Sequence, residues 1–307
     1  FIVGVSISLS YKDKKLNGPV FFKLTKRSLK LIGLGLFLGA FTISFPFIKA
    51  VENIRFPGVL QRIGLVFFFA SIIYLWGSKR STALIIGIIL LAYWLWMGFL
   101  PLDGVAPTYE RAANNWANFI DFKVLGSHMW KPDYDPEGIL STLPAIATAL
   151  LGTLAGDVLR SNTYQKVSLL LISGLVLLGL GYLLDLSFPI NKALWSSSFV
   201  MVTAGWANLV LGILFYLREV KKFRFGEVFS KVGANGIAIY FTASFITKLF
   251  YLIPVNGSSI HGFLFENIYL NKGLAPELSS LLYALTVCFF YLLMASFMHK
   301  KKIFFKV

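Results

Sequence analysis

The sequence predicts an all-α polytopic membrane protein, a bundle of eight full transmembrane helices with the end of a ninth before them. Hydrophobic residues make up 57% of the 307 residues, charged residues make up 14%, and the mean hydropathy is +0.72, which excludes a soluble globular domain. The apolar runs are about 19 residues long, enough for a helix to cross roughly 30 Å of hydrocarbon. The runs 82–100 and 167–186 are apolar on every face, whereas strands of a membrane barrel alternate with a period of two.

The N-terminal segment 1–10 is apolar but too short to span a bilayer. It is interpreted as the end of a helix that starts upstream, in an N-terminal part missing from this chain. Eight longer runs follow, and together they are expected to form a single transmembrane domain over residues 1–307. The predicted spans are 31–48, 59–76, 82–100, 139–158, 167–186, 195–217, 233–253 and 278–299.

The basic residues predict the orientation. Most of the 29 Lys and Arg lie in alternate connections, and the positive-inside rule places these connections in the cytoplasm together with the C-terminus. Orientation also explains the net charge of +15, so nucleic acid is not expected as a partner. The predicted cytoplasmic connections are 11–30, 77–81, 159–166, 218–232 and the C-terminal tail, and the external ones are 49–58, 101–138, 187–194 and 254–277.

The external connection 101–138 is long and rich in Trp, Asp, Asn and Pro. Loops of this length are unusual without a role. On a membrane protein the role is a lid or a wall that faces a substrate, and the alternative is a solvated plug.

Few residues of the chain suit metal or nucleophilic chemistry. The single cysteine, Cys288, excludes an internal disulfide framework, and with three histidines no metal site is predicted. His261 and His299 are interpreted as a loop residue and an interfacial residue. His128 lies among aromatic residues in the long external loop, where it could contact a substrate.

Polar residues at membrane depth are the stronger indication of function, because a charge there is costly and tends to line a cavity. Arg62 lies about one turn inside a predicted helix on its external half. It either snorkels to the headgroups, pairs with a buried acid or binds an anionic ligand. Asn235, between two glycines, either forms an interhelical hydrogen bond or lines a polar path.

Two external helix starts also carry polar clusters. Asp133, Asp135 and Glu137 precede the helix predicted from residue 139, and one carboxylate would be enough to cap it. The excess of acids favours binding of a cationic or hydroxyl-rich ligand. The next external helix start carries an amide, a cation and an aromatic ring in Asn191, Lys192 and Trp195, and Trp195 would also fit an interfacial aromatic belt.

Four blocks of this sequence resemble the transmembrane heparan-α-glucosaminide N-acetyltransferase family and its bacterial acyltransferase relatives. Their order and spacing agree with the family along nearly the whole chain. The blocks are FPGVLQR at 56–62, YDPEGILST at 134–142, PINKALWS at 189–196 and GANGIAIY at 233–240.

The resemblance implies transfer of an acetyl group from cytoplasmic acetyl-CoA to an amino sugar on the other side of the membrane. In that family the histidine thought to carry the chemistry precedes a helix that ends like residues 1–6 of this chain. No residue of this sequence can take that position, so no catalytic residue is assigned. The expected lining of the acetyl-CoA path is Arg62, Asn191 and Asn235, and the expected acceptor contacts are Asp135, Glu137, Trp195 and His128.

The resemblance also suggests a homodimer, and the short connections and lack of disulfides suit a bacterial inner membrane. Two other functional classes stay open at this point. A transporter or flippase of a sugar-containing lipid or small solute would explain the buried polar residues and the long external loop. A membrane scaffold without catalytic activity would need neither.

Overall fold

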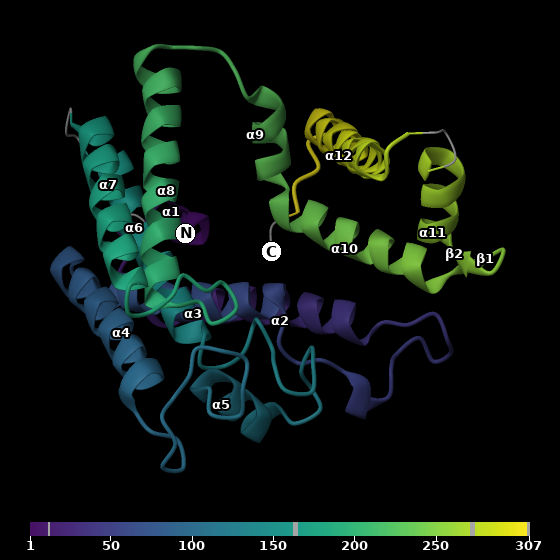
Figure 1. The fold of residues 1–307 in the computed structure, drawn as a ribbon. Helices are drawn as coiled ribbons and strands as arrows, with labels where there is room; N and C mark the ends of the chain where they lie inside the picture. Colours follow the sequence, from purple (N-terminus) through teal and green to yellow (C-terminus); the bar gives the residue numbers. More distant parts are fainter. Residues whose placement is uncertain (12, 162–164, 271–273, 306–307) are drawn as a thin grey trace. The chain divides into compact units, whose positions relative to one another are not determined.

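The computed structural model describes residues 1–11, 13–161, 165–270 and 274–305, and most of these residues are helical, with long loops between some of the helices and almost no strand (Figure 1). They form two compact units. The first unit comprises Phe1–Gly39 and Val51–Phe223, and the second comprises Ala40–Ala50 and Arg224–Val307. The prediction of one transmembrane domain stays a prediction.

The first unit contains nearly all of the predicted site residues. Its elements are α1 (Ile2–Ser10), α2 (Gly18–Ala40), the 3-10 turn η1 (Val51–Asn53), α3 (Val59–Trp76), α4 (Lys79–Phe99), α5 (Trp116–Leu125), α6 (Thr142–Arg160), α7 (Lys166–Asp185), α8 (Ser197–Phe215) and the π-helical turn η2 (Tyr216–Val220). The ten-residue helix α5 lies within the long loop predicted to be external.

The second unit is built mainly from α10 and α12. Its elements are α9 (Glu227–Ala234), α10 (Gly236–Leu252), a hairpin of β1 (Pro254–Val255) and β2 (Ser258–Ser259), α11 (Ile260–Leu264), the π-helical turn η3 (Phe265–Tyr269) and α12 (Pro276–Lys300).

Six helices of the described chain are long and apolar enough to cross a membrane. They coincide with six of the predicted spans, within a few residues at most ends, and they support an integral membrane protein. The count of eight full spans is not confirmed. The six helices are Val59–Trp76, Lys79–Phe99, Thr142–Arg160, Lys166–Asp185, Ser197–Val220 and Pro276–Lys300.

The predicted span 31–48 is wrong in its boundaries. The helix there is α2, which begins at Gly18 and ends at Ala40, so it includes Lys23, Lys26, Arg27 and Lys30 of the predicted connection. Lys and Arg are good helix formers, and their presence does not end a helix. Beyond Ala40 the chain instead turns back on itself, with Phe41 paired to Ile48.

The predicted span 233–253 is interrupted at Asn235. α9 ends at Ala234, and α10 has 17 residues, fewer than the other apolar helices. The buried amide of Asn235 accepts a hydrogen bond from Phe305 N and donates one to the Ile303 carbonyl, both at 3.0 Å. The side chain therefore holds the C-terminal tail at the break between the helices.

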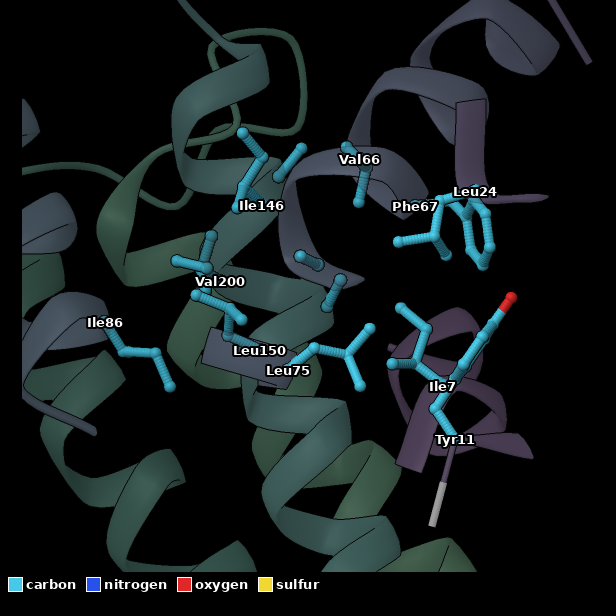
Figure 2. Packing of buried hydrophobic residues seen from close by; sticks show 14 of the residues in the cluster. Ile7, Tyr11, Leu24, Val66, Phe67, Leu75, Ile86, Ile146, Leu150 and Val200 are labelled. Atoms are coloured by element: carbon cyan, nitrogen blue, oxygen red, sulfur yellow. The ribbon is translucent and has the colours of Figure 1, made fainter. Parts of the chain in front are cut away.

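The core of the first unit forms around α6, which contacts α1, α3, α4 and α8. Small residues dominate its buried faces, and they let neighbouring helices approach closely. Figure 2 shows the resulting packing, in which Leu150 of α6 and Val200 of α8 belong to the same cluster as Ile7 and Phe67. This packing holds the ends of these helices in place, and the predicted functional residues are at those ends.

Close contact between α7 and α8 leads to a first prediction. A Cβ on Gly205 would lie 2.8 Å from the Leu178 side chain and 2.9 Å from the Gly174 carbonyl oxygen. Since a backbone atom cannot move aside easily, Gly205→Ala is expected to lower the free energy of unfolding by about 1–3 kcal/mol. Gly179→Ala in α7 is the matched control because nothing lies within 4 Å of its Cβ. Thermal unfolding in detergent measures both, and equal stabilities would contradict the prediction.

Candidate functional site

Three of the four sequence blocks meet at one end of the first unit, where α3, α6 and α8 begin. Arg62, in the first turn of α3, donates hydrogen bonds to the Gly138 carbonyl and to Ser141 Oγ. Its guanidinium carbon lies 5.1 Å from the centre of the Trp195 ring. The fold thus brings together Arg62, predicted to line the acetyl-CoA path, and the acidic loop and Trp195, predicted to contact the acceptor.

An ion pair missed by the sequence analysis organises the acidic loop. Arg55 Nε lies 2.8 Å from Asp135 Oδ2, and Arg55 Nη2 lies 2.6 Å from Asp135 Oδ1 and 2.5 Å from Glu137 Oε2. Burial alone would lower the pKa of Arg55, but the hydrogen bonds and charges of the two carboxylates outweigh burial and raise it. A usable signal was present, because Arg55 directly precedes the first sequence block.

The two acids of this pair differ in what they can still bind. The Asp135 side chain has no exposed surface, and it also accepts hydrogen bonds from Trp130 N at 2.8 Å and Glu137 N at 2.9 Å. The Glu137 side chain is 18% exposed. Asp135 therefore braces the loop, and Glu137 is the member of the pair with surface left for a ligand.

Arg62 is buried and incompletely paired. The residue is 6% exposed, and its Nε and Nη1 have no hydrogen-bond partner among the described residues. No carboxylate of that part of the chain lies within 4.0 Å to form a salt bridge. Of the three sequence interpretations, this geometry fits neither snorkelling nor pairing with a buried acid.

Trp195 is partly buried, and contacts within the fold fix its side chain. Its Nε1 donates to Thr148 Oγ1 at 3.0 Å, and its ring packs against Phe199 of α8. Tyr93 of α4 supports the preceding turn by donating to the Leu194 carbonyl at 2.6 Å. The contacts with Thr148 and Phe199 fix the position of the indole, and one face of its ring packs against the Arg62 guanidinium.

Asp121, on α5, is a second residue that the sequence analysis missed. It is 2% exposed, accepts a hydrogen bond from Ile139 N at 2.7 Å, and lies so close to Gly138 that a Cβ there would collide with its carboxylate. Burial raises its pKa to about 6, the charge of Asp135 adds to this, and the Ile139 hydrogen bond opposes it. One acid in a mostly apolar ten-residue helix gave no sequence signal.

His128 lies beside this site. Its Nδ1 is 2.8 Å from the Ile54 carbonyl oxygen, its ring stacks on Phe56 at 3.9 Å, and its own carbonyl accepts a hydrogen bond from Phe56 N at 3.0 Å. These contacts fix the segment that carries Arg55. An acceptor contact by His128 stays a prediction.

The two asparagines predicted to line the acetyl-CoA path hold turns. Asn191 Oδ1 accepts hydrogen bonds from Ala193 N at 2.8 Å and Leu194 N at 3.3 Å, which shapes the turn before α8. Asn235 belongs to the second unit and holds its C-terminal tail. Their contact with acetyl-CoA stays untested.

A cavity of about 630 Å³ lies at the opposite ends of α3 and α6 from this site. Its lining includes four basic residues and two acidic ones, and the carboxylate of one acid, Asp157, accepts hydrogen bonds from Ser8 Oγ at 2.7 Å and Tyr74 OH at 2.8 Å. The excess of positive charge is suited to phosphate groups. The basic residues of the lining are Lys14, Lys15, Lys79 and Arg160.

No protein-family profile matches the chain. Two curated proteins are similar to it, both named heparan-alpha-glucosaminide N-acetyltransferase. The Homo sapiens protein is 28% identical and the Mus musculus protein 26% identical, over 78% of this chain in each case. The chain spans 45% of the length of either relative. The similarity agrees with the resemblance carried by the four sequence blocks.

Proposed function

Since this chain is a relative of the heparan-α-glucosaminide N-acetyltransferases, we propose that it forms part of a membrane-bound acyltransferase. The enzyme moves an acetyl group from cytoplasmic acetyl-CoA to an amino sugar on the external side. The observation that carries the proposal is the pair of sites at opposite ends of α3 and α6. One is a basic cavity, and the other is the cluster of buried Arg62 with the partly exposed Arg55 and Glu137.

The basic cavity receives the nucleotide end of acetyl-CoA in this proposal. The phosphates of the donor are strong acceptors for Lys and Arg side chains. The cavity lies beside the connections 11–30 and 77–81, which the positive-inside rule places in the cytoplasm. Donor entry from the cytoplasm and a cytoplasmic C-terminus then follow from one orientation.

The acceptor amino sugar binds at the opposite, external end. Glu137 has exposed surface beside Arg55, and its carboxylate can accept a hydrogen bond from an ammonium or a hydroxyl group. Trp195, Asp135 and His128 shape the surroundings of this carboxylate. An amine must lose a proton to attack a thioester, and no base for this step is assigned within the chain.

We place the enzyme in a bacterial inner membrane, as a homodimer. Two experiments test the dimer. One is blue-native electrophoresis of membranes solubilised in mild detergent, and the other is chemical crosslinking in the membrane before solubilisation. A single monomeric band under both conditions would exclude it.

The function is tested with the full-length natural protein in detergent. We expect release of free CoA from acetyl-CoA that depends on added glucosamine and yields N-acetylglucosamine. Binding of acetyl-CoA without transfer would exclude glucosamine as acceptor. No binding at all, combined with glucosamine or glycolipid movement across proteoliposomes, would replace the enzyme by a transporter or flippase.

The donor cavity gives a second prediction. Lys79→Glu is expected to raise the KM for acetyl-CoA about five- to tenfold with little change in kcat, because the loss of one phosphate contact weakens binding by about 1 kcal/mol. Initial rates at varied acetyl-CoA concentrations measure the effect. Lys123→Glu on α5, outside the cavity, is the control. An equal KM in both variants would remove Lys79 from the donor site.

A further inference from the structure

Two nitrogens of the Arg62 guanidinium donate no hydrogen bond within the described part of the chain. Nη2 is engaged by the Gly138 carbonyl and Ser141 Oγ, whereas Nε and Nη1 are buried without a hydrogen-bond partner in the described part of the chain. A buried cation with open donors is costly, and such groups normally find an acceptor. The missing acceptor is therefore expected to arrive with a ligand.

The charges around Arg62 restrict the kind of ligand. The carboxylates of Glu137, Asp135 and Asp121 lie close enough to act on Arg62 electrostatically, and Arg55 is the other cation of the cluster. With all groups ionised, three negative charges face two positive ones. A phosphate or carboxylate would add to this excess, while a neutral carbonyl oxygen brings no charge in the ground state.

We propose that Arg62 donates a hydrogen bond from one of its two unpartnered nitrogens, Nε or Nη1, to the carbonyl oxygen of the acyl donor and stabilises the negative charge that this oxygen gains in the transition state. The inference rests on the proposed function and adds the role of one residue to it. Trp195 covers one face of the guanidinium, so the oxygen approaches in the guanidinium plane, where the N–H groups point.

The reaction step balances as follows. The nitrogen of the neutral amine bonds to the carbonyl carbon, and the π pair of the carbonyl moves onto the oxygen that faces Arg62. When the carbonyl re-forms, the C–S bond breaks and the pair leaves on the sulfur of CoA. The proton lost by the nitrogen ends on that sulfur, so the products are the amide and the free thiol. Donors aimed at the developing oxyanion accelerate such a step.

Binding of two unreactive analogues tests the contact directly. In one, CH₂ replaces the thioester sulfur of acetyl-CoA and the carbonyl is kept; the other, S-ethyl-CoA, has no carbonyl. We expect the full-length wild-type protein to bind the ketone about tenfold more tightly, and Arg62→Met to bind both equally. Arg111→Met is the matched control. Arg111 forms an exposed ion pair with Asp133 in the loop 101–138, which also carries Asp135 and Glu137.

Kinetics and stability separate this role from a structural one. Arg62→Met is expected to lower kcat on the order of 10²–10³-fold with the KM for acetyl-CoA within about threefold. Its unfolding temperature should not fall, because the variant removes a buried unpaired cation. Arg62→Lys, which keeps the charge but changes the donor geometry, is expected to restore only part of kcat.

The outcomes distinguish this inference from the proposed function. If Arg62→Met keeps the preference for the ketone, or if it loses both analogues together with a lower unfolding temperature, Arg62 is structural or holds only water. If the preference depends on Arg62 but wild type acetylates no amino sugar, the acceptor is wrong and the role of Arg62 stands. If wild type binds neither analogue, the donor assignment falls and this inference falls with it.

Discussion

Replacement of Arg55 by methionine is expected to lower the free energy of unfolding by about 2–4 kcal/mol. The change leaves the Asp135 carboxylate without its charged partner in a place where its side chain has no exposed surface. Removing one partner of a buried ion pair is more costly than the pair itself is stabilising, because the remaining charge stays desolvated. The partial exposure of Arg55 keeps the estimate below that for a fully buried pair.

The same measurement on Arg111→Met supplies the control for Arg55. Arg111 also binds an aspartate through two nitrogens, but both Arg111 and Asp133 are about half exposed. Exposed pairs contribute little to stability, so this variant is expected to unfold at nearly the same temperature as wild type. Thermal unfolding in detergent compares the two. Equal losses would show that burial does not distinguish the pairs, and the account of Asp135 as a brace would fail.

Asp121→Asn is expected to make the protein more stable than wild type above pH 6 and equally stable near pH 4. The folded-state pKa is raised from 3.8 to about 6, so the folded protein binds this proton more tightly than the unfolded chain does. Wild type therefore loses stability relative to the variant as the pH rises from about 4 to about 6, and the difference stays constant above. A shift of about two pKa units sets an upper limit of about 3 kcal/mol.

The groups that face Asp121 enter this prediction. Asp135 raises the pKa of Asp121, whereas Arg62 and the Ile139 amide lower it, and Tyr93 lies near enough to feel its charge. Unfolding of both proteins between pH 4 and pH 8 provides the test. Asp133→Asn is the control, because Arg111 lowers the pKa of that exposed carboxyl and no gain at high pH is expected. A less stable Asp121→Asn at pH 8 would mean that Arg62 stabilises the ionised form.

A change in the protonation of Asp121 would also affect the proposed site. It would act through contacts within the protein, because Asp121 is not expected to touch the substrate. Its carboxylate accepts the Ile139 amide and lies against Gly138, and the Gly138 carbonyl in turn binds Arg62. Asp121 is thus a positioning residue in this arrangement. Asp121→Asn keeps an acceptor for Ile139, so its effect on kcat is expected to be small above pH 7.

Local sequence patterns were sufficient for the parts of the fold that depend on burial of whole segments. Six long apolar runs became six helices because a run of that length and composition has few other stable forms in a membrane. Sequence patterns did not predict helix boundaries that depend on individual side chains. The amide of Asn235 holds the tail at a helix break, and α2 extends back through its basic residues.

By itself, the sequence determined the class of the protein and its resemblance to one family. It also singled out Arg62 as a candidate for the donor path and Asp135, Glu137 and Trp195 as candidates for the acceptor site. Composition and short motifs are sufficient for these conclusions, because both can be identified from residues that lie close together in the sequence. Only the tertiary structure decided which of these side chains are fully hydrogen-bonded within the protein and which keep unpaired groups or exposed surface. The pairing of Arg55 with Asp135, the burial of Asp121 under Gly138 and the free nitrogens of Arg62 depend on segments up to 80 residues apart meeting in space. No periodicity within a segment records such a meeting.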